Sequence, residues 1–165
     1  MPASDQPILP TLRVESLCRV DGKSRLTLPD ALQPVAAGWD GKCKVVKERP
    51  GALSLWPADH VDQDIDAAIS AALKKYEVRR NQNLLDELMT LGRLRSTRET
   101  VVRLDGRARL TIPAAFREFL GVEPEGQAMV VAATVCIEIW RPDAWREFVE
   151  QRIADYRTIS EALLE

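Results

Sequence analysis

Residues 21–29 read DGKSRLTLP, and residues 105–113 read DGRARLTIP. The two stretches share Asp, Gly, Arg, Leu, Thr and Pro at the same places, at an offset of 84. The same offset carries Trp56 onto Trp140, with no gap between the motif and the tryptophan. A match that holds its spacing over this length predicts two repeats of one structural unit, separated by an insert.

Strand-like segments flank the Asp-Gly pair in each repeat. LRVESLCRV and SRLTL lie on either side of the first pair, and ETVVRL and ARLTI on either side of the second. Asp-Gly between two such runs is typical of a β-hairpin, because the turn needs residues that tolerate positive φ. Each repeat is therefore predicted to open with a β-hairpin, followed by a short helix after Pro29 or Pro113 and two further strands.

Helical patterns occupy the insert and the end of the chain. Apolar residues from Ile65 to Tyr76 share one helical face, a second stripe of leucines ends at Gly92, and residues 143–164 form a third helix. The sequence predicts an α+β protein with four parts. These are a first repeat (14–59), a helical connector (60–97), a second repeat (98–143) and a C-terminal helix (144–165).

Composition excludes several classes of protein. The 165 residues are 45% hydrophobic and 29% charged, as in a soluble globular protein, and no apolar run approaches the ~20 residues of a membrane span. Residues 1–10 do not resemble a secretory signal and are expected to form a loose arm, so we expect a cytoplasmic protein. The three cysteines lie far apart without metal-ligand spacing, so no metal, cofactor or disulfide is predicted.

An enzyme is one competing interpretation. The sole histidine, His60, has no nucleophile motif near it, and no phosphate-binding loop is present. The acids of both repeats stand beside arginines, which favours ion pairs over acid/base catalysis. We therefore predict no catalytic residue and no small-molecule substrate.

Positive charge gathers around the repeats although the net charge is −2. Residues 91–109 hold six arginines and two acids, whereas residues 110–165 hold five arginines and ten acids. A two-stranded β-ribbon fits the DNA major groove, and an arginine fork can bind a guanine edge or clamp a phosphate. Double-stranded DNA is therefore the predicted partner, and the aspartates are expected to hold the turn and orient the arginine. The candidate DNA-binding residues are Asp21, Lys23, Arg25, Asp105, Arg107, Arg109, Arg19 and Arg103.

The doubled Asp-x-x-x-Arg motif, the proline after each following strand and the closing tryptophans resemble the MraZ family of bacterial transcription regulators. The resemblance implies a pseudo-twofold swapped-hairpin β-barrel built from two tandem SpoVT-AbrB-type units. It also implies a ring of subunits that uses the helices and binds direct DNA repeats upstream of the division and cell-wall gene cluster. The functional residues that it implies are Asp21, Arg25, Asp105 and Arg109, and a nucleoid-associated location follows.

Assembly fits the charge count, because about six cations on one chain should give weak binding that several subunits would multiply. The chain departs from the family at Ser24 and Ala108, which stand where members usually carry Gly before the motif arginine. The second competing interpretation is an oligomeric scaffold or an antitoxin-like module that binds protein instead of DNA.

Overall fold

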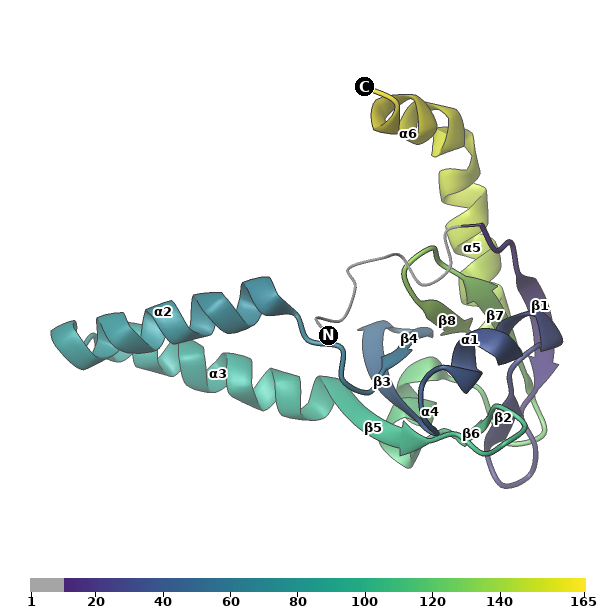
Figure 1. The fold of residues 1–165 in the computed structure, drawn as a ribbon, viewed down its shortest axis with the longest axis horizontal. Helices are drawn as coiled ribbons and strands as arrows, with labels where there is room; N and C mark the ends of the chain where they lie inside the picture. Colours follow the sequence, from purple (N-terminus) through teal and green to yellow (C-terminus); the bar gives the residue numbers. More distant parts are fainter. Residues whose placement is uncertain (1–10) are drawn as a thin grey trace.

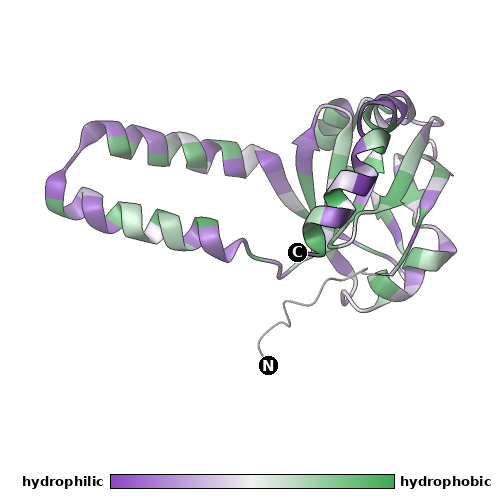
Figure 2. Cartoon of the chain, turned by 90° about the horizontal axis from the view of Figure 1, so that it is seen from above, coloured by the Kyte–Doolittle hydropathy of each residue, from purple (hydrophilic) through white to green (hydrophobic). Residues whose placement is uncertain are grey.

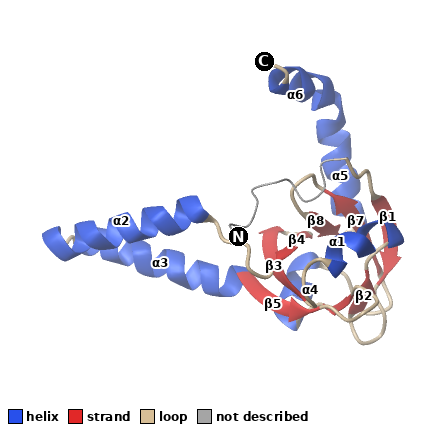
Figure 3. Ribbon diagram, in the orientation of Figure 1, coloured by secondary structure: helices blue, strands red, loops and turns tan. Residues whose placement is uncertain are grey.

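The structure is a computed structural model that describes residues 11–165, and it is an α+β fold as expected (Figure 1, Figure 3). The first repeat contains β1 (Glu15–Arg19), β2 (Arg25–Thr27), the 3-10 turn η1 (Asp30–Leu32), α1 (Gln33–Ala37), β3 (Lys42–Arg49) and β4 (Ala52–Pro57). The connector contains α2 (Gln63–Arg79) and α3 (Gln82–Arg98). The second repeat contains β5 (Glu99–Arg103), β6 (Arg109–Thr111), α4 (Ala114–Leu120), β7 (Gln127–Ala132) and β8 (Ile137–Trp140). The chain continues through α5 (Pro142–Arg152), η2 (Ile153–Asp155) and α6 (Tyr156–Leu163). The arm predicted for residues 1–10 lies outside the described residues.

The strands of the two repeats interlock. A six-stranded antiparallel sheet has the order β1-β7-β8-β4-β3-β5, and β2 pairs with β6 in a separate two-stranded sheet. The first strand of each repeat therefore pairs with the third strand of the other repeat. Within the described residues the six strands form an open sheet with β1 and β5 at its edges, and no closed barrel is found.

The hairpin predicted at the start of each repeat is present, but it closes through a single bridge and has no longer ladder between its two strands. Val20, directly after β1, bridges Leu26 of β2, and Leu104, directly after β5, bridges Leu110 of β6. The ladders of β2 and β6 instead run between the repeats. Local sequence signals could not reveal this pairing, because its partners lie far apart in the chain.

The spacing between the repeats is also less regular than the sequence suggested. In the first repeat Lys44 of β3 pairs with Trp56 of β4, and in the second repeat Met129 of β7 pairs with Trp140 of β8. Equivalent residues of the two repeats are therefore 85 positions apart in the third strands, β3 and β7, and 84 positions apart in the fourth strands, β4 and β8. A bulge in β3 between Lys47 and Arg49 absorbs the difference. The predicted match without a gap therefore fails by one residue in β3.

The core lies between the sheets and the short helices, and it draws on both repeats. Leu26 of β2 is fully buried, Leu110 of β6 is 1% exposed, and the two are directly opposite each other. Trp140 is 3% exposed and packs in a second cluster with Trp145 and Phe148 of α5. This cluster attaches the C-terminal helix to the sheet. The main cluster includes Val20, Leu28, Leu32, Val45, Leu53, Leu55, Ile112, Phe116, Leu120, Val130, Ile137 and Ile139.

The connector helices form an antiparallel pair that projects away from the strands (Figure 1, Figure 2). Asp62 caps the start of α2, and Asn81 caps the start of α3 with hydrogen bonds to two backbone N–H groups. Gly92 lies inside α3, so the predicted end at this glycine is wrong; one helical glycine costs only ~1 kcal/mol. No residue of α2 or α3 is buried. None of the helices in residues 11–165 has the length and apolar character of a membrane span.

Glu138 in β8 is a half-buried acid whose charge opposes folding. Burial raises its pKa above the ordinary value, nearby Glu48 raises it further, and the N–H of Trp140 donates to its Oε1 at 3.3 Å. A folded-state pKa above the unfolded value means that stability is lost as pH rises through the folded pKa.

We therefore expect Glu138→Gln to raise the free energy of unfolding at pH 7–8, since the amide keeps the acceptor for Trp140 and removes the charge. The gain should shrink as the pH falls through the folded-state pKa of Glu138, because the wild-type side chain then takes up a proton. Urea titrations across this pH range measure it, with the exposed Glu150→Gln as the matched control. A Glu138→Gln protein that is no more stable than wild type at pH 8 would contradict this account.

Candidate nucleic-acid interface

Both Asp-x-x-x-Arg stretches fold into the same closed turn, which we call the first turn (residues 21–25) and the second turn (residues 105–109). Asp21 Oδ1 accepts the backbone N–H groups of Lys23 and Arg25 at 2.9 Å each, and its Oδ2 accepts Arg25 Nε at 2.7 Å. The equivalent bonds to Asp105 measure 2.9, 3.1 and 2.8 Å. The spacing of four residues lets one carboxylate close the turn and hold the arginine.

These bonds lower the pKa of both aspartates. The backbone N–H of Arg25 is the main reason that the pKa of Asp21 lies below its usual value, and the Arg25 side chain adds to it. For Asp105 the main cause of the lowered pKa is the backbone N–H of Arg107. Because a lowered folded-state pKa contributes stability above the unfolded pKa, these bonds persist at neutral pH and weaken only in acid below about pH 4.

The left-handed residue of each turn is not the glycine that the sequence suggested. Ser24 has φ 61° and Ala108 has φ 56°, whereas neither Gly22 nor Gly106 has positive φ. The N–H groups of Ser24 and Ala108 donate to the carbonyls of the preceding aspartates at 3.0 Å. A residue with a Cβ in this conformation costs about 1–2 kcal/mol, which explains why glycine is favoured before the motif arginine.

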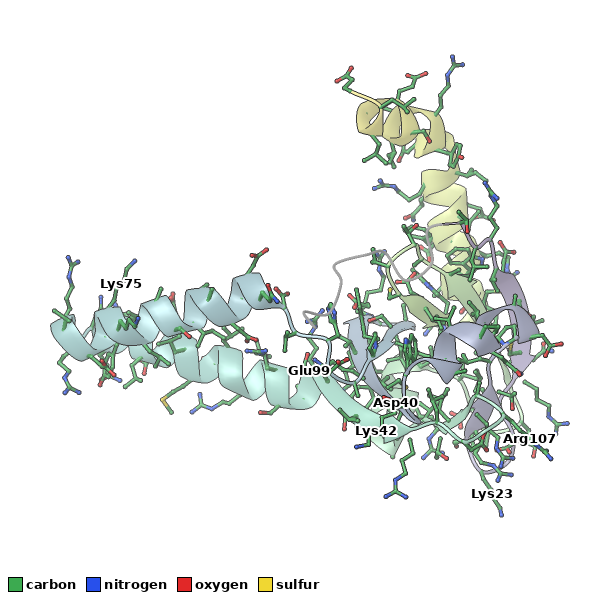
Figure 4. The ribbon with its side chains drawn as sticks, in the orientation of Figure 1. Lys23, Asp40, Lys42, Lys75, Glu99 and Arg107 are labelled. Carbon is green, nitrogen blue, oxygen red and sulfur yellow. The ribbon has the colours of Figure 1, made fainter. Side chains whose placement is uncertain are left out.

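The strands that leave the two turns bring them together. β2 and β6 pair so that Arg25 lies opposite Thr111 and Arg109 lies opposite Thr27. The two-stranded ribbon predicted within each repeat is therefore replaced by one ribbon shared between the repeats. Figure 4 shows Lys23 and Arg107 at the same end of the molecule, away from the projecting α2–α3 pair. The structure thus places Lys23 of the first turn and Arg107 of the second turn at one end of the molecule.

The motif arginines are half-buried, not fully exposed as the sequence suggested. The Arg25 side chain is 33% exposed and that of Arg109 is 35% exposed. Only Nε is engaged by the aspartate, and within residues 11–165 no hydrogen bond is found at the Nη atoms of either arginine. The outer edge of each guanidinium is therefore available to a ligand that accepts two hydrogen bonds, such as a guanine edge or a phosphate.

The other predicted cations differ in their surroundings. Arg19 on β1 forms an ion pair with Glu125, whereas Arg103 on β5 forms none with the described residues. Of the arginines at the end of the connector, Arg95 pairs with Asp66 at 2.9 Å. These pairs hold elements of the fold together, so charge counts along the sequence overstated the free positive charge.

Sequence reasoning missed two residues beside the first turn. Arg117 of α4 donates to the Ser24 hydroxyl, and Glu125 lies beside Gly22 as well as Arg19. The only sequence signal was that Ser24 replaces the usual glycine. Nothing in the local pattern of AAFREFL indicates that Arg117 reaches across 93 residues.

Comparison with known proteins gives a consistent result. A family model described as "MraZ protein, putative antitoxin-like" matches residues 97–165. A protein of Saccharopolyspora erythraea is 27% identical over 146 residues, covering 88% of this chain and 92% of the relative. Proteins of Xanthomonas campestris pv. campestris and Thermomicrobium roseum are 27% and 24% identical over 144 residues. These two matches cover 86% and 87% of this chain and 89% and 91% of the relatives. All three relatives bear the name "Transcriptional regulator MraZ".

Proposed function

Because this chain belongs to the MraZ family, we propose that it is a transcription regulator that binds double-stranded DNA through the first and second turns. The observation that carries the proposal is the pairing of β2 with β6, which joins the two turns in one ribbon. Lys23, Arg25, Arg107 and Arg109 then face one ligand together. A ribbon of this kind suits the major groove, where arginine forks read guanine and lysines neutralise phosphates.

The target belongs to the same proposal. Direct DNA repeats upstream of the division and cell-wall gene cluster are the expected operators, and DNA binding would place the protein at the nucleoid in the cytoplasm. Residues 14–59 and 98–143 would form the DNA-binding body. The exchange of strands between them is compatible with a swapped-hairpin barrel.

A salt titration tests DNA binding directly. We expect a duplex carrying the upstream region of the protein's own gene to bind with an affinity that falls steeply between low and physiological salt. The logarithmic slope should be about −0.9 for each phosphate contact, because cations on the turns displace condensed counterions. Fluorescence anisotropy at four salt concentrations measures the slope. Affinity that does not change with salt, or no binding at all, would favour the scaffold or antitoxin-like alternative.

Self-association is the second part of the proposal, and the helices support it. None of the residues of α2, α3, α5 and α6 is buried, and large apolar side chains are exposed on both the α2–α3 pair and the C-terminal segment. Residues 63–98 hold seven cations and five acids, whereas residues 142–165 hold six acids and three cations. Apolar faces of opposite net charge, pointing in different directions on one chain (Figure 1), favour head-to-tail contact between subunits, which can close a ring. The exposed apolar residues are Ile65, Leu73, Val78, Met89, Leu94, Ile153, Tyr156, Ile159, Leu163 and Leu164.

We expect Leu73→Ser/Ile159→Ser to reduce the assembly to smaller species, because it removes apolar area from both helical faces while leaving the strand core intact. Light scattering after size-exclusion chromatography gives the mass. Val135→Ser is the control, since Val135 is 46% exposed, as Leu73 is, but lies in the turn between β7 and β8. The same mass for all three proteins would show that the helices do not carry the assembly.

A further inference from the structure

The first turn is braced from outside by two side chains of the second repeat. Arg117 donates from Nη1 to the hydroxyl of Ser24, whose residue is only 3% exposed. Glu125, which directly precedes Gly126 and β7, forms an ion pair with Arg19. A Cβ placed on Gly22 would lie 2.7 Å from Glu125 Oε1, so the carboxylate also sits against the turn backbone. The first turn is therefore held by contacts that its own sequence does not supply.

The second turn lacks the first of these braces although its internal hydrogen bonds are the same. Ala108 stands in the place of Ser24 and has no side-chain oxygen to accept a hydrogen bond. Gln33 stands in the place of Arg117, but its amide donates within its own repeat, at 3.3 and 3.4 Å. No side chain of α1 thus reaches the second turn as Arg117 reaches the first.

The second brace is missing as well. Asp40 is the structural counterpart of Glu125, since both residues have positive φ, of 53° and 69°. Each also precedes a glycine whose carbonyl accepts a backbone N–H: Gly41 accepts from Leu104, and Gly126 accepts from Val20. Asp40 is one methylene shorter, and in the described part of the chain it forms no ion pair with Arg103. Arg103 is therefore not ion-paired within the described residues, whereas the equivalent Arg19 is paired with Glu125.

Open space lies on one side of the second turn. A cavity of about 630 Å³ lies between this turn and the η1–α1 segment, lined by Gln33, Ala37, Leu104, Gly106 and Ala108 among others. A Cβ on Gly106 would meet nothing within 4 Å, in contrast to Gly22. The second turn therefore has fewer side chains packed against it than the first.

We infer that the two turns divide DNA recognition unequally, and that Arg117 and Glu125 are the positioning residues that create the difference. The braced first turn presents Arg25 in a fixed orientation and discriminates base sequence, because preorganised groups lose little freedom on binding. The unbraced second turn supplies adaptable contacts to phosphates, because Arg103 and Arg107 form no ion pair within the described residues and Arg109 is held by Asp105 alone. The inference rests on the proposed DNA binding.

Hydrogen exchange of the free protein tests the brace without DNA. The two turns have matching internal bonds, so the amides of Lys23 and Ser24 can be compared directly with those of Arg107 and Ala108. We expect slower exchange in the first turn by at least about tenfold, since opening it must also break the contacts of Arg117 and Glu125. Equal exchange in the two turns of the wild-type protein would overturn the inference.

Two sets of variants assign the difference to the brace. Arg117→Ala and Ser24→Ala should each accelerate exchange in the first turn alone, and Arg117→Lys should restore part of the protection. Gln33→Arg/Ala108→Ser should transfer the brace and slow exchange in the second turn, with Gln33→Arg alone as its control. If the Arg117→Ala variant exchanges as wild type does, the brace is not what distinguishes the turns.

Binding to an operator duplex and to a random duplex of equal length tests the division itself. Arg117→Ala should lower the ratio of the two affinities about tenfold, the effect of losing one well-oriented base contact, while the salt slope stays unchanged. Glu125→Gln should steepen the slope by up to ~0.9 because it releases Arg19, and Arg103→Ala should flatten the slope more than Arg19→Ala does.

The outcomes separate the inference from the function on which it rests. The division of roles would be overturned if Arg117→Ala lowered the affinity for both duplexes equally. It would also be overturned if the Arg19→Ala and Arg103→Ala proteins had the same dependence of affinity on salt. A wild-type protein that shows unequal exchange but binds neither duplex would overturn the proposed DNA binding and the division with it. The unequal bracing of the turns would then still stand as measured.

Discussion

Replacing Arg25 and Arg109 together by alanine is expected to lower the affinity for the operator duplex by about 10²- to 10⁴-fold, since each bidentate contact contributes ~1–3 kcal/mol. The turns should stay closed in the variant, because the aspartates keep the backbone N–H groups of residues 23 and 25, and of residues 107 and 109. The loss therefore reports on the two guanidinium forks and not on the fold. Anisotropy titrations together with thermal unfolding of the same samples measure it.

A matched control removes charge elsewhere. Arg79 and Arg146 are exposed on α2 and α5, so Arg79→Ala/Arg146→Ala changes the net charge by the same amount away from the turns. This control should bind within a few-fold of wild type, in samples whose assembly mass by light scattering equals that of wild type. If the Arg25→Ala/Arg109→Ala protein binds as tightly as the control, or unfolds at the temperature of the assay, the two arginines are not the DNA-reading groups.

Charge and geometry can be separated at the same positions. Arg25→Lys/Arg109→Lys keeps both charges but loses the planar fork and the Nε–H that each aspartate holds. We expect this variant to keep the salt dependence of wild type and to lose its preference for the operator. A lysine variant with full preference would show that the arginines act as charges only.

The sequence contained the local part of the site but not its assembly. Asp21 and Arg25 could be paired from their spacing alone, because one carboxylate at this distance reaches both the backbone and the side chain of the arginine. The glycine expected to supply positive φ was assigned to the wrong position, since Ser24 adopts that conformation. In this strained conformation Ser24 is buried and its hydroxyl accepts a hydrogen bond from Arg117. Neither the burial nor the contact can be predicted from a hairpin motif.

The pairing of strands was the larger difference. Alternating residues on either side of Asp-Gly predict neighbours within a hairpin, and this would have kept the two turns on separate ribbons. The observed sheet instead pairs β2 with β6 and exchanges β1 and β5 between the repeats. Short strands of three residues, such as β2, carry too few side chains to specify a partner by themselves. Their partner is chosen by burial of Leu26 and Leu110 in the common core.

That choice leads to the second large effect: Leu26→Ala/Leu110→Ala is expected to remove most of the stability of the protein. Leu26 is fully buried and Leu110 is 1% exposed, and a buried Leu→Ala change costs about 2–5 kcal/mol. Because a domain has only ~5–15 kcal/mol of stability, the double variant should unfold at a much lower temperature and urea concentration than wild type. Val135→Ala, at a position 46% exposed in the turn between β7 and β8, is the control and should change stability by no more than about 0.5 kcal/mol.

The single variants show why this pair matters to function. Directly opposite residues in one core share neighbours, so the free energies of the two substitutions should differ from additivity by ~0.5–3 kcal/mol. Each single variant should also accelerate hydrogen exchange in both turns, because either leucine helps to hold the ribbon from which both turns extend. Strict additivity, or exchange that changes only in the turn next to the substituted strand, would mean that the two turns are independent of each other. The shared ribbon would then not be what presents them to one DNA duplex.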